Sequence, residues 1–404
     1  MHCHNRLLLI GMILMACLPV PVASAVDPLW TVAATTSGEL STVVVSADGS
    51  TIIAGGDQLI ALSRDGSKLW TGWSGSLLVI SQDGKYVLTA RDQNARMISG
   101  TGTMLWDQWL EVPVTDMSMT PNASLILAGG ANRLRLISPS GEGIRHNVTM
   151  PVMSHFRLFP DGGQMVITST KGIHTSNLTF FSEWTDANVT QDYVEVAGDG
   201  SSFVSVTNNR IRFYTRDGHL IWERALPGGN ALGFAFSRDG STIVVGRDDN
   251  TLSVLDRDGN LLWTAPAAYW VTSVAVSDDG NTIVAGSIDK TVSVYDRAGT
   301  KLGFATAKSQ IKSGSVAVSG DGSVIAAVDG STVYGFSRSQ FTQPVTPLIP
   351  TSSPAITTPA LSTTPVTPAY TAVTTPVTTP RAALPPAGPF GALVLFLVWR
   401  SRKS

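Results

Sequence analysis

Residues 271–303 read VTSVAVSDDGNTIVAGSIDKTVSVYDRAGTKLG and residues 231–263 read ALGFAFSRDGSTIVVGRDDNTLSVLDRDGNLLW, so the two stretches align without a gap. Each contains an apolar strand, an Asp-Gly turn, two further apolar strands and a short final strand, which in several copies ends in Leu-Trp. Polar and apolar side chains alternate within these strands, and a period of two is typical of a β-sheet with differently packed faces.

The same phrase occurs eight times along the chain. Its turn residue is found at Asp48, Asp83, Asn122, Asp161, Asp199, Asp239, Asp279 and Asp321. The successive separations are 35, 39, 39, 38, 40, 40 and 42 residues, and a period near 40 with four short strands is typical of a propeller blade. We therefore predict an all-β, eight-bladed β-propeller over residues 26–340. We expect its Asp-Gly pairs to form two-residue hairpin turns.

The two ends of the repeat region complement each other. The eighth unit, from Ser313, lacks a Leu-Trp strand, whereas DPLWTVA at residues 27–33 precedes the first unit without partners of its own. We predict that this N-terminal strand completes the last blade, with Trp30 beside the segment around Tyr334, and thereby removes exposed sheet edges. A seven-bladed ring with one irregular unit is the alternative, because the third and fourth units are degenerate.

Two propeller families resemble this repeat. The turns VSDDG and FSRDG are similar to the Ser-Pro-Asp-Gly turns of WD-like and YVTN-type propellers, and VLDRDGNLLW resembles the ALDxxTGKxLW phrase of pyrroloquinoline-quinone-type repeats. The resemblance covers about residues 27–340 and implies that fourth-strand tryptophans dock one blade on the next. Those tryptophans are Trp30, Trp70, Trp106, Trp222 and Trp263. Both families include dehydrogenases and scaffolds, so the resemblance selects no activity.

The first 25 residues have the features of a signal peptide. Arg6 precedes an apolar run, and an Ala-Ser-Ala sequence ends at Ala25, which suits signal peptidase. We expect export with cleavage after Ala25, and the alternative is lipoprotein processing at Cys17. The only cysteines are Cys3 and Cys17, so such cleavage would leave none for a disulfide, a thiolate metal site or a nucleophile.

The composition changes abruptly after the propeller. Residues 341–387 consist almost entirely of Thr, Pro, Ser, Ala and Val, from which we predict a disordered stalk that extends about 3 Å per residue and accepts O-glycans. Residues 388–404 join a short apolar segment to a basic end and resemble the PGF-CTERM sorting signals of archaeal surface proteins. We expect this segment to serve as a membrane anchor or to be exchanged for a lipid, although its apolar run has about half the roughly 20 residues that span a bilayer.

Four N-x-Ser/Thr triplets in the third to fifth units are candidate N-glycosylation sites of an exported chain. They lie at Asn122, Asn147, Asn177 and Asn188. Asn122 occupies the turn position of its unit, and we therefore expect it to be the most exposed of the four.

Residue patterns typical of catalysis are not found in the sequence. The four histidines beyond the signal segment lack ligand spacing, and the oxygen-rich turn 256–260 lacks the glutamate that completes a calcium loop. Active quinone-dependent propellers carry calcium-binding acids, a base and often a cysteine pair, which we do not find in this chain. The formal net charge of −2 provides no basic face for nucleic acid. We predict no catalytic, metal or cofactor-binding residues and no nucleic-acid partner.

These features together predict a monomeric, non-catalytic binding or scaffolding propeller, exported and held at the cell surface, which binds an envelope protein or a polysaccharide. One alternative is an exported quinone-type dehydrogenase or hydrolase, which a cluster of Asp, Glu, His or Arg at one mouth of the pore would favour. The other alternative is a structural component of the envelope, which would associate with copies of itself.

Overall fold

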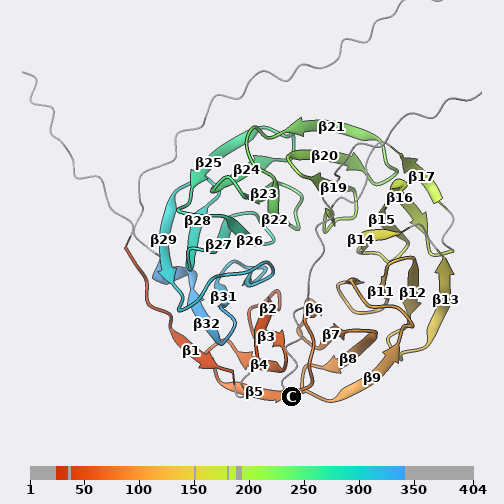
Figure 1. The fold of residues 1–404 in the computed structure, drawn as a ribbon, viewed down its shortest axis with the longest axis horizontal. Helices are drawn as coiled ribbons and strands as arrows, with labels where there is room; N and C mark the ends of the chain where they lie inside the picture. Colours follow the sequence, from red (N-terminus) through yellow and green to blue (C-terminus); the bar gives the residue numbers. More distant parts are fainter. Residues whose placement is uncertain (1–23, 35–37, 150–151, 180–181, 188–192, 342–404) are drawn as a thin grey trace, which may run out of the picture. The chain divides into compact units, whose positions relative to one another are not determined.

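The computed structural model describes residues 24–34, 38–149, 152–179, 182–187 and 193–341. Within them, eight four-stranded antiparallel sheets follow one another around a central axis as the blades of a β-propeller (Figure 1). The predicted eight-bladed architecture is therefore confirmed, and the seven-bladed alternative is wrong. The stalk from residue 342, the C-terminal apolar segment and residues 1–23 lie outside the described residues.

Each blade contains four strands, which follow one another from the axis outward. Blades 1 and 2 contain β2 (Leu40–Val45), β3 (Thr51–Gly56), β4 (Leu59–Ser63), β5 (Lys68–Gly72), β6 (Leu77–Ile80), β7 (Tyr86–Arg91), β8 (Asn94–Ser99) and β9 (Met104–Trp109). Blades 3 and 4 contain β10 (Asp116–Met119), β11 (Ile126–Gly130), β12 (Arg133–Ile137), β13 (Gly143–Thr149), β14 (Met153–Leu158), β15 (Gln164–Ser169), β16 (Gly172–Asn177) and β17 (Ser182–Asp186). Blades 5 and 6 contain β18 (Tyr193–Val196), β19 (Ser202–Thr207), β20 (Arg210–Thr215), β21 (Leu220–Ala225), β22 (Ala231–Phe236), β23 (Thr242–Arg247), β24 (Thr251–Asp256) and β25 (Leu261–Pro266). Blades 7 and 8 contain β26 (Val271–Val276), β27 (Thr282–Ser287), β28 (Thr291–Asp296), β29 (Lys301–Thr306), β30 (Val316–Val318), β31 (Val324–Val328), β32 (Thr332–Ser337) and β1 (Trp30–Ala33).

The ring has two chemically different faces. In each blade the first strand lies nearest the axis and the fourth forms the outer edge (Figure 1). Because all neighbouring strands are antiparallel, the connections from first to second and from third to fourth strand emerge on one face, which we call the turn face. The connections from second to third strand and from one blade to the next emerge on the opposite face, the loop face.

The N-terminal strand closes the ring, as predicted. Strand β1 pairs antiparallel with β32, with Trp30 opposite Gly335 and Thr31 opposite Tyr334. Just before it, the Leu29 amide donates to the Gly335 carbonyl at 2.9 Å. The last blade is therefore built from both ends of the repeat region, and the ring is held shut by hydrogen bonds and packing rather than by a covalent link.

The first turn of each blade is longer than the two-residue hairpin expected from its sequence. In blade 1 the Ser46 amide donates to the Thr51 carbonyl at 2.9 Å, and the Thr51 amide donates back to the Ser46 hydroxyl at 3.0 Å. The Asp48 carboxylate accepts from the Ser46 hydroxyl at 2.7 Å and from the Ser50 amide at 2.9 Å. The aspartate side chain thus takes the place of a backbone acceptor and stabilises a turn of four residues.

The hydrophobic core lies between the blades. Ile52 and Leu62 of blade 1 pack with Ala326 and Val333 of blade 8, and all four side chains are shielded from solvent. Similar clusters join other neighbouring blades, so each sheet depends on its neighbours to bury its apolar faces.

The described chain ends at Phe341, after the 3-10 turn η1 (Arg338–Gln340) that follows β32 on the turn-face side. Phe341 is buried, with its ring 5.8 Å from that of Phe336. It also covers Gly303 on the outer strand of blade 7, where an added methyl group would lie 2.9 Å from the Phe341 Cδ1 atom. Phe341, which composition places at the start of the stalk, therefore packs as part of the propeller. Within the described ranges, no helix has the length and apolar character needed to cross a membrane.

Candidate binding face

The turns of the turn face interlock around the axis. Backbone amides in the first turns of successive blades donate to carbonyls of the next, at 2.7 to 3.2 Å. The pairs are Ala47 with Gln82, Gln82 with Pro121, Gly198 with Arg238, Asp239 with Asp278, Asp278 with Gly320, and Asp321 with Ala47. These bonds join the first turns of blades 1 to 3 and of blades 5 to 8 and back to blade 1.

Side chains fill the same end of the channel. The Gln82 amide oxygen, in the orientation that satisfies both groups, accepts from the Arg238 guanidinium, with Nε at 3.2 Å. The two residues belong to blades 2 and 6, which lie opposite each other in the ring, so this contact crosses the axis. Asp278 lies beside Arg238, and burial raises the pKa of its carboxyl. Side chains from three blades thus meet at the axis on the turn face.

Arginines join neighbouring blades on the turn face. Arg216 of blade 5 pairs with Asp161 in the first turn of blade 4 at 2.8 Å, and it lies over the Phe159 ring at 4.8 Å. Equivalent contacts from a third turn to the first turn of the preceding blade are made by Arg64 with Ser323, Arg257 with Ser201, and Arg297 with Ser241. The polar groups of this face are thus used to hold blades together.

Exposed aromatic side chains lie at several positions around the loop face. Trp73, Trp109, Tyr193, Tyr269 and Trp270 are between 44% and 58% exposed, and each lies in a connection between blades or at the loop-face end of a strand. Exposed aromatics supply large contact area with small entropic cost, and they are enriched in the energetic centres of protein interfaces. We call these five residues the aromatic set.

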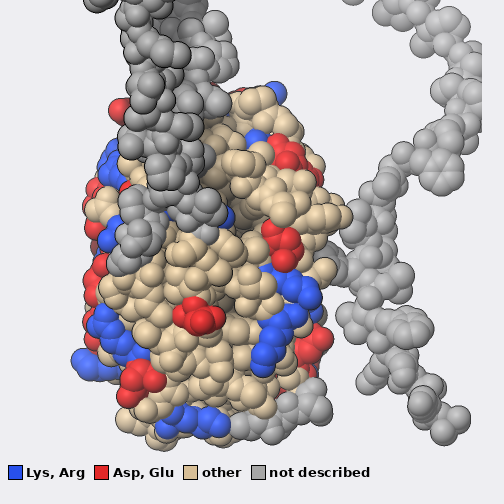
Figure 2. Space-filling model, turned by 90° about the vertical axis from the view of Figure 1, so that its left-hand side faces the viewer, with Lys and Arg blue, Asp and Glu red and all other residues tan. Residues whose placement is uncertain are grey.

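Charged residues of both signs are present on the side of the ring that faces the viewer in Figure 2. In the side view, Lys and Arg are interspersed with Asp and Glu among neutral residues (Figure 2). This agrees with the near-neutral composition.

A charged network lies in the channel on the first strands of blades 3, 4 and 5. The Asp116 carboxylate accepts from Arg157 at 2.9 Å and lies 3.3 Å from the His155 Nδ1 atom, while Arg157 also pairs with Glu195 at 2.8 Å. The His155 ring stacks on Tyr193 with centroids 4.4 Å apart. Burial opposes ionisation of Asp116, but Arg157 and His155 hold its pKa below the ordinary value.

Sequence reasoning missed this network because its members have no local motif. They do share positions within the repeat: Asp116, His155 and Tyr193 each lie six residues before the turn anchor, and Arg157 and Glu195 lie four before it. Superposing the eight units would therefore have brought them together. The acids are paired with the arginine and the histidine, so the network joins three blades and leaves no unpaired base beside a nucleophile.

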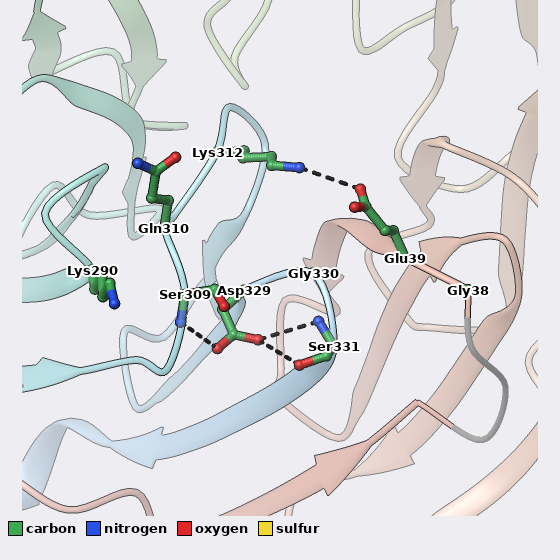
Figure 3. A pocket seen from close by; sticks show the side chains of 9 residues that line it. All are labelled: Gly38, Glu39, Lys290, Ser309, Gln310, Lys312, Asp329, Gly330 and Ser331. Atoms are coloured by element: carbon green, nitrogen blue, oxygen red, sulfur yellow. Dashed lines mark hydrogen bonds and ion pairs between the residues drawn. The ribbon is translucent and has the colours of Figure 1, made fainter. Parts of the chain in front are cut away.

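A cavity of about 500 Å³ opens on the loop face where blades 7, 8 and 1 meet, and we call it the seam pocket. Lys312 and Glu39 point toward each other across its mouth, 3.2 Å apart, and Lys290 lies on the far side of Gln310 (Figure 3). Asp329 forms the floor and accepts from the Ser309 and Ser331 amides at 3.0 and 3.2 Å. The pocket thus spans the closure between the first and last blades.

The predicted docking tryptophans lie on outer strands, each against the following blade. Trp263 is buried and donates its indole N–H to the Arg297 carbonyl at 2.9 Å, and a methyl group at Gly299 would lie 2.8 Å from its Cγ atom. The same donation to the next blade is made by Trp30, Trp70, Trp106 and Trp222. Trp184 covers Gly218 in the same manner, although its unit lacks the Leu-Trp phrase. Its position 38 residues before Trp222 was the available signal.

The predicted modification sites are spread over the fold. Asn122 is exposed on the turn face of blade 3, and Asn177 is half-buried at the end of β16. Asn147 lies in β13, where side chains are not described, and Asn188 lies outside the described residues. Ala25, the expected cleavage point, bridges to Phe304 of blade 7.

No group of three potential metal-ligating side chains is found among the described residues. In the oxygen-rich turn considered for calcium, the Asp256 carboxylate accepts from the Asp258 amide at 3.0 Å and from the Asn260 amide at 2.8 Å. These contacts are the ones that a tight turn between two strands requires.

Comparison with known proteins agrees with this architecture. Residues 259–296 match the family model described as WD domain, G-beta repeat. The fold resembles the C-terminal WD40 domain of Sif2, with a TM-score of 0.66 and 13% identity over 78% of this chain and 99% of that one. It also resembles Sqt1 from Chaetomium thermophilum, with a TM-score of 0.62 and 13% identity over 77% and 99% of the two chains.

The chain has the WD40 propeller fold. No curated protein matches it in sequence. WD40 propellers are typically scaffolds for protein interaction and usually not enzymes. The WD-like part of the resemblance is therefore confirmed over residues 259–296, which include the turn VSDDG.

Proposed function

We propose that this WD40 propeller is a non-catalytic binding module that is exported, displayed at the cell surface, and binds an envelope protein through its loop face. The observation that carries the proposal is the aromatic set on that face, opposite a turn face whose groups are bonded to one another. A binding surface needs exposed apolar side chains that a partner can bury, and the loop face provides them.

The position at which the C-terminal part of the chain leaves the propeller supports the choice of the loop face. Phe341, the last described residue, follows η1 on the turn-face side of blade 8. A tether that begins there leaves the loop face free of the propeller's own attachment point. The expected export signal and the predicted C-terminal anchor provide the two ends of such a display.

The charged network in the channel favours an enzyme at the pore. Asp116 and Glu195 are each engaged in an ion pair with Arg157, whose side chain is three-quarters buried. Groups held in this way stabilise neighbouring blades, whereas a general base must be free to accept a proton from a substrate. We therefore prefer binding to catalysis.

Surface display can be tested on intact cells that produce the protein. A membrane-impermeant lysine reagent should label the propeller without lysis, and intact-mass analysis should show a chain that begins at Val26. Full-length protein recovered unlabelled from cytosol would contradict the proposal.

The binding face can be tested with matched variants of the full-length protein. Replacing Trp109 and Trp270 by Ala should reduce recovery of the native complex from solubilised membranes about tenfold, since interface aromatics are frequent hot spots. Leu69→Ala and Ile221→Ala are the controls, because these side chains are equally exposed but lie on outer strands toward the turn face. Equal loss in the control variants would refute the assignment of the loop face.

A further inference from the structure

The seam pocket has a floor whose carboxylate oxygens are already hydrogen-bonded. The Asp329 carboxylate accepts from the Tyr334 hydroxyl at 2.6 Å and from the amides of Lys308 and Ser309, each at 3.0 Å. Burial opposes its ionisation, but Tyr334 and the amides of Ser331 and Ser309 hold the pKa of Asp329 below its ordinary value. The floor therefore fixes two loops of blade 8 in place and does not compete for a ligand.

The cationic groups at the rim are only partly used. Lys312 pairs with Glu39 at 3.2 Å, and both side chains are more than half exposed, so water screens this ion pair. The Lys290 ammonium makes no ion pair or hydrogen bond with any described residue. Two lysines, the Gln310 amide and the Ser331 hydroxyl therefore line a space with room for a small segment of another molecule.

Two members of the aromatic set adjoin this rim. The Ile288 amide donates to the Trp270 carbonyl at 3.2 Å, and the Ser287 hydroxyl donates to the Tyr269 carbonyl at 3.2 Å. Lys290 lies in the same short connection, between β27 and β28. The loop that carries Lys290 and the loop that carries the two aromatic residues are thus bonded to each other.

We propose that the seam pocket receives an acidic peptide segment of the partner protein. Its carboxylates replace Glu39 at Lys312 and bind Lys290, and an adjacent apolar side chain rests on Tyr269 and Trp270. A carboxylate ligand is favoured because Glu39, itself a carboxylate, already occupies one of the two cationic positions. This inference rests on the protein-binding function proposed above and names the chemistry of the bound segment.

The test uses full-length protein and two fluorescently labelled hexapeptides, GEELEE and its uncharged counterpart GQQLQQ, with binding measured by fluorescence anisotropy. The acidic peptide should bind and the amide peptide should not, and added salt should weaken the binding. Lys290→Ala with Lys312→Ala should weaken it about tenfold, since both charge contacts are lost. Lys85→Ala, an exposed lysine on the turn face, should leave it unchanged.

Glu39→Gln provides a test in the opposite direction. Freeing Lys312 from its exposed ion pair should tighten binding of the acidic peptide about threefold. Weaker binding by Glu39→Gln, or equal binding of the two peptides, would overturn the proposal. So would lysine-dependent binding of oligogalacturonate in place of the peptide. If the Trp109 and Trp270 variants still lose the native complex in that case, the proposed function stands and only the acidic segment is wrong.

Discussion

The contact between Trp263 and Gly299 permits a controlled test of how neighbouring blades are held together. Gly299 has a φ of 91° and lies so close to the indole that an added methyl group would be 2.8 Å from Trp263 Cγ. Gly330 has a similar φ of 97°, but nothing lies within 4 Å of where its methyl group would be. Gly299→Ala and Gly330→Ala therefore share the cost of an L-residue at positive φ, about 1–2 kcal/mol, and differ in the clash.

Overpacking a well-ordered contact costs about 1–3 kcal/mol, so Gly299→Ala should lower the free energy of unfolding by that much more than Gly330→Ala. Guanidinium denaturation followed by tryptophan fluorescence measures the free energy of unfolding of both variants. When the dependence of this free energy on denaturant concentration is unchanged, the shift in midpoint gives the difference in stability. Losses that agree within about 0.5 kcal/mol would refute the reasoning, because the approach of Trp263 to the next blade would then carry no energetic weight.

Two further predictions concern the closure and the channel. Trp30→Ala should destabilise the propeller by about 2–3 kcal/mol, because a half-buried indole and its hydrogen bond to the Arg64 carbonyl are lost, whereas the exposed Leu29→Ala should change stability by less than about 0.5 kcal/mol. Thermal unfolding of the two variants measures these changes in stability. Similar losses of stability in Trp30→Ala and Leu29→Ala would contradict the role of β1 as the closing strand. Asp116→Asn should cost about 2 kcal/mol at neutral pH, since it leaves Arg157 without one of its two partners. The folded-state pKa of Asp116 is lowered from 3.8, so its stabilisation is present above that value and is lost as the pH falls below it. The difference between wild type and Asp116→Asn should therefore shrink below about pH 4 in urea unfolding, and a constant difference down to pH 2 would exclude the linkage.

The blade count and the closing strand could be read from the sequence because both depend on local period-two patterns and on a turn residue that returns at each repeat. Exceptions to the repeat could not be read in this way. Trp184 performs its docking role from a strand that lacks the Leu-Trp phrase. Blade 7 has Gly303 where six of the other seven outer strands have tryptophan, and the ring that covers it comes from Phe341, outside the repeat. Trp184 and Phe341 fill these positions through contacts between residues distant in sequence, and a local sequence pattern does not predict such contacts.

The residues of the candidate binding face could not be predicted from a local sequence pattern either. The loops that carry Trp73, Tyr269 and Trp270 differ in length and composition between blades, so no periodicity marks them. Their common feature is their position on one face, and this appears only once antiparallel pairing fixes where each connection emerges. The seam pocket likewise requires Glu39 and Lys312, 273 residues apart, to meet at the closure.

Binding of a partner at the loop face is the proposal on which the acidic-segment inference depends. Photo-crosslinking can locate the contact surface, with a benzophenone amino acid placed at position 73, 270 or 221 of the full-length protein in the cells that produce it. We predict the same partner adduct from positions 73 and 270 and none from position 221, on the outer strand of blade 5. Adducts from position 221 alone would contradict binding at the loop face.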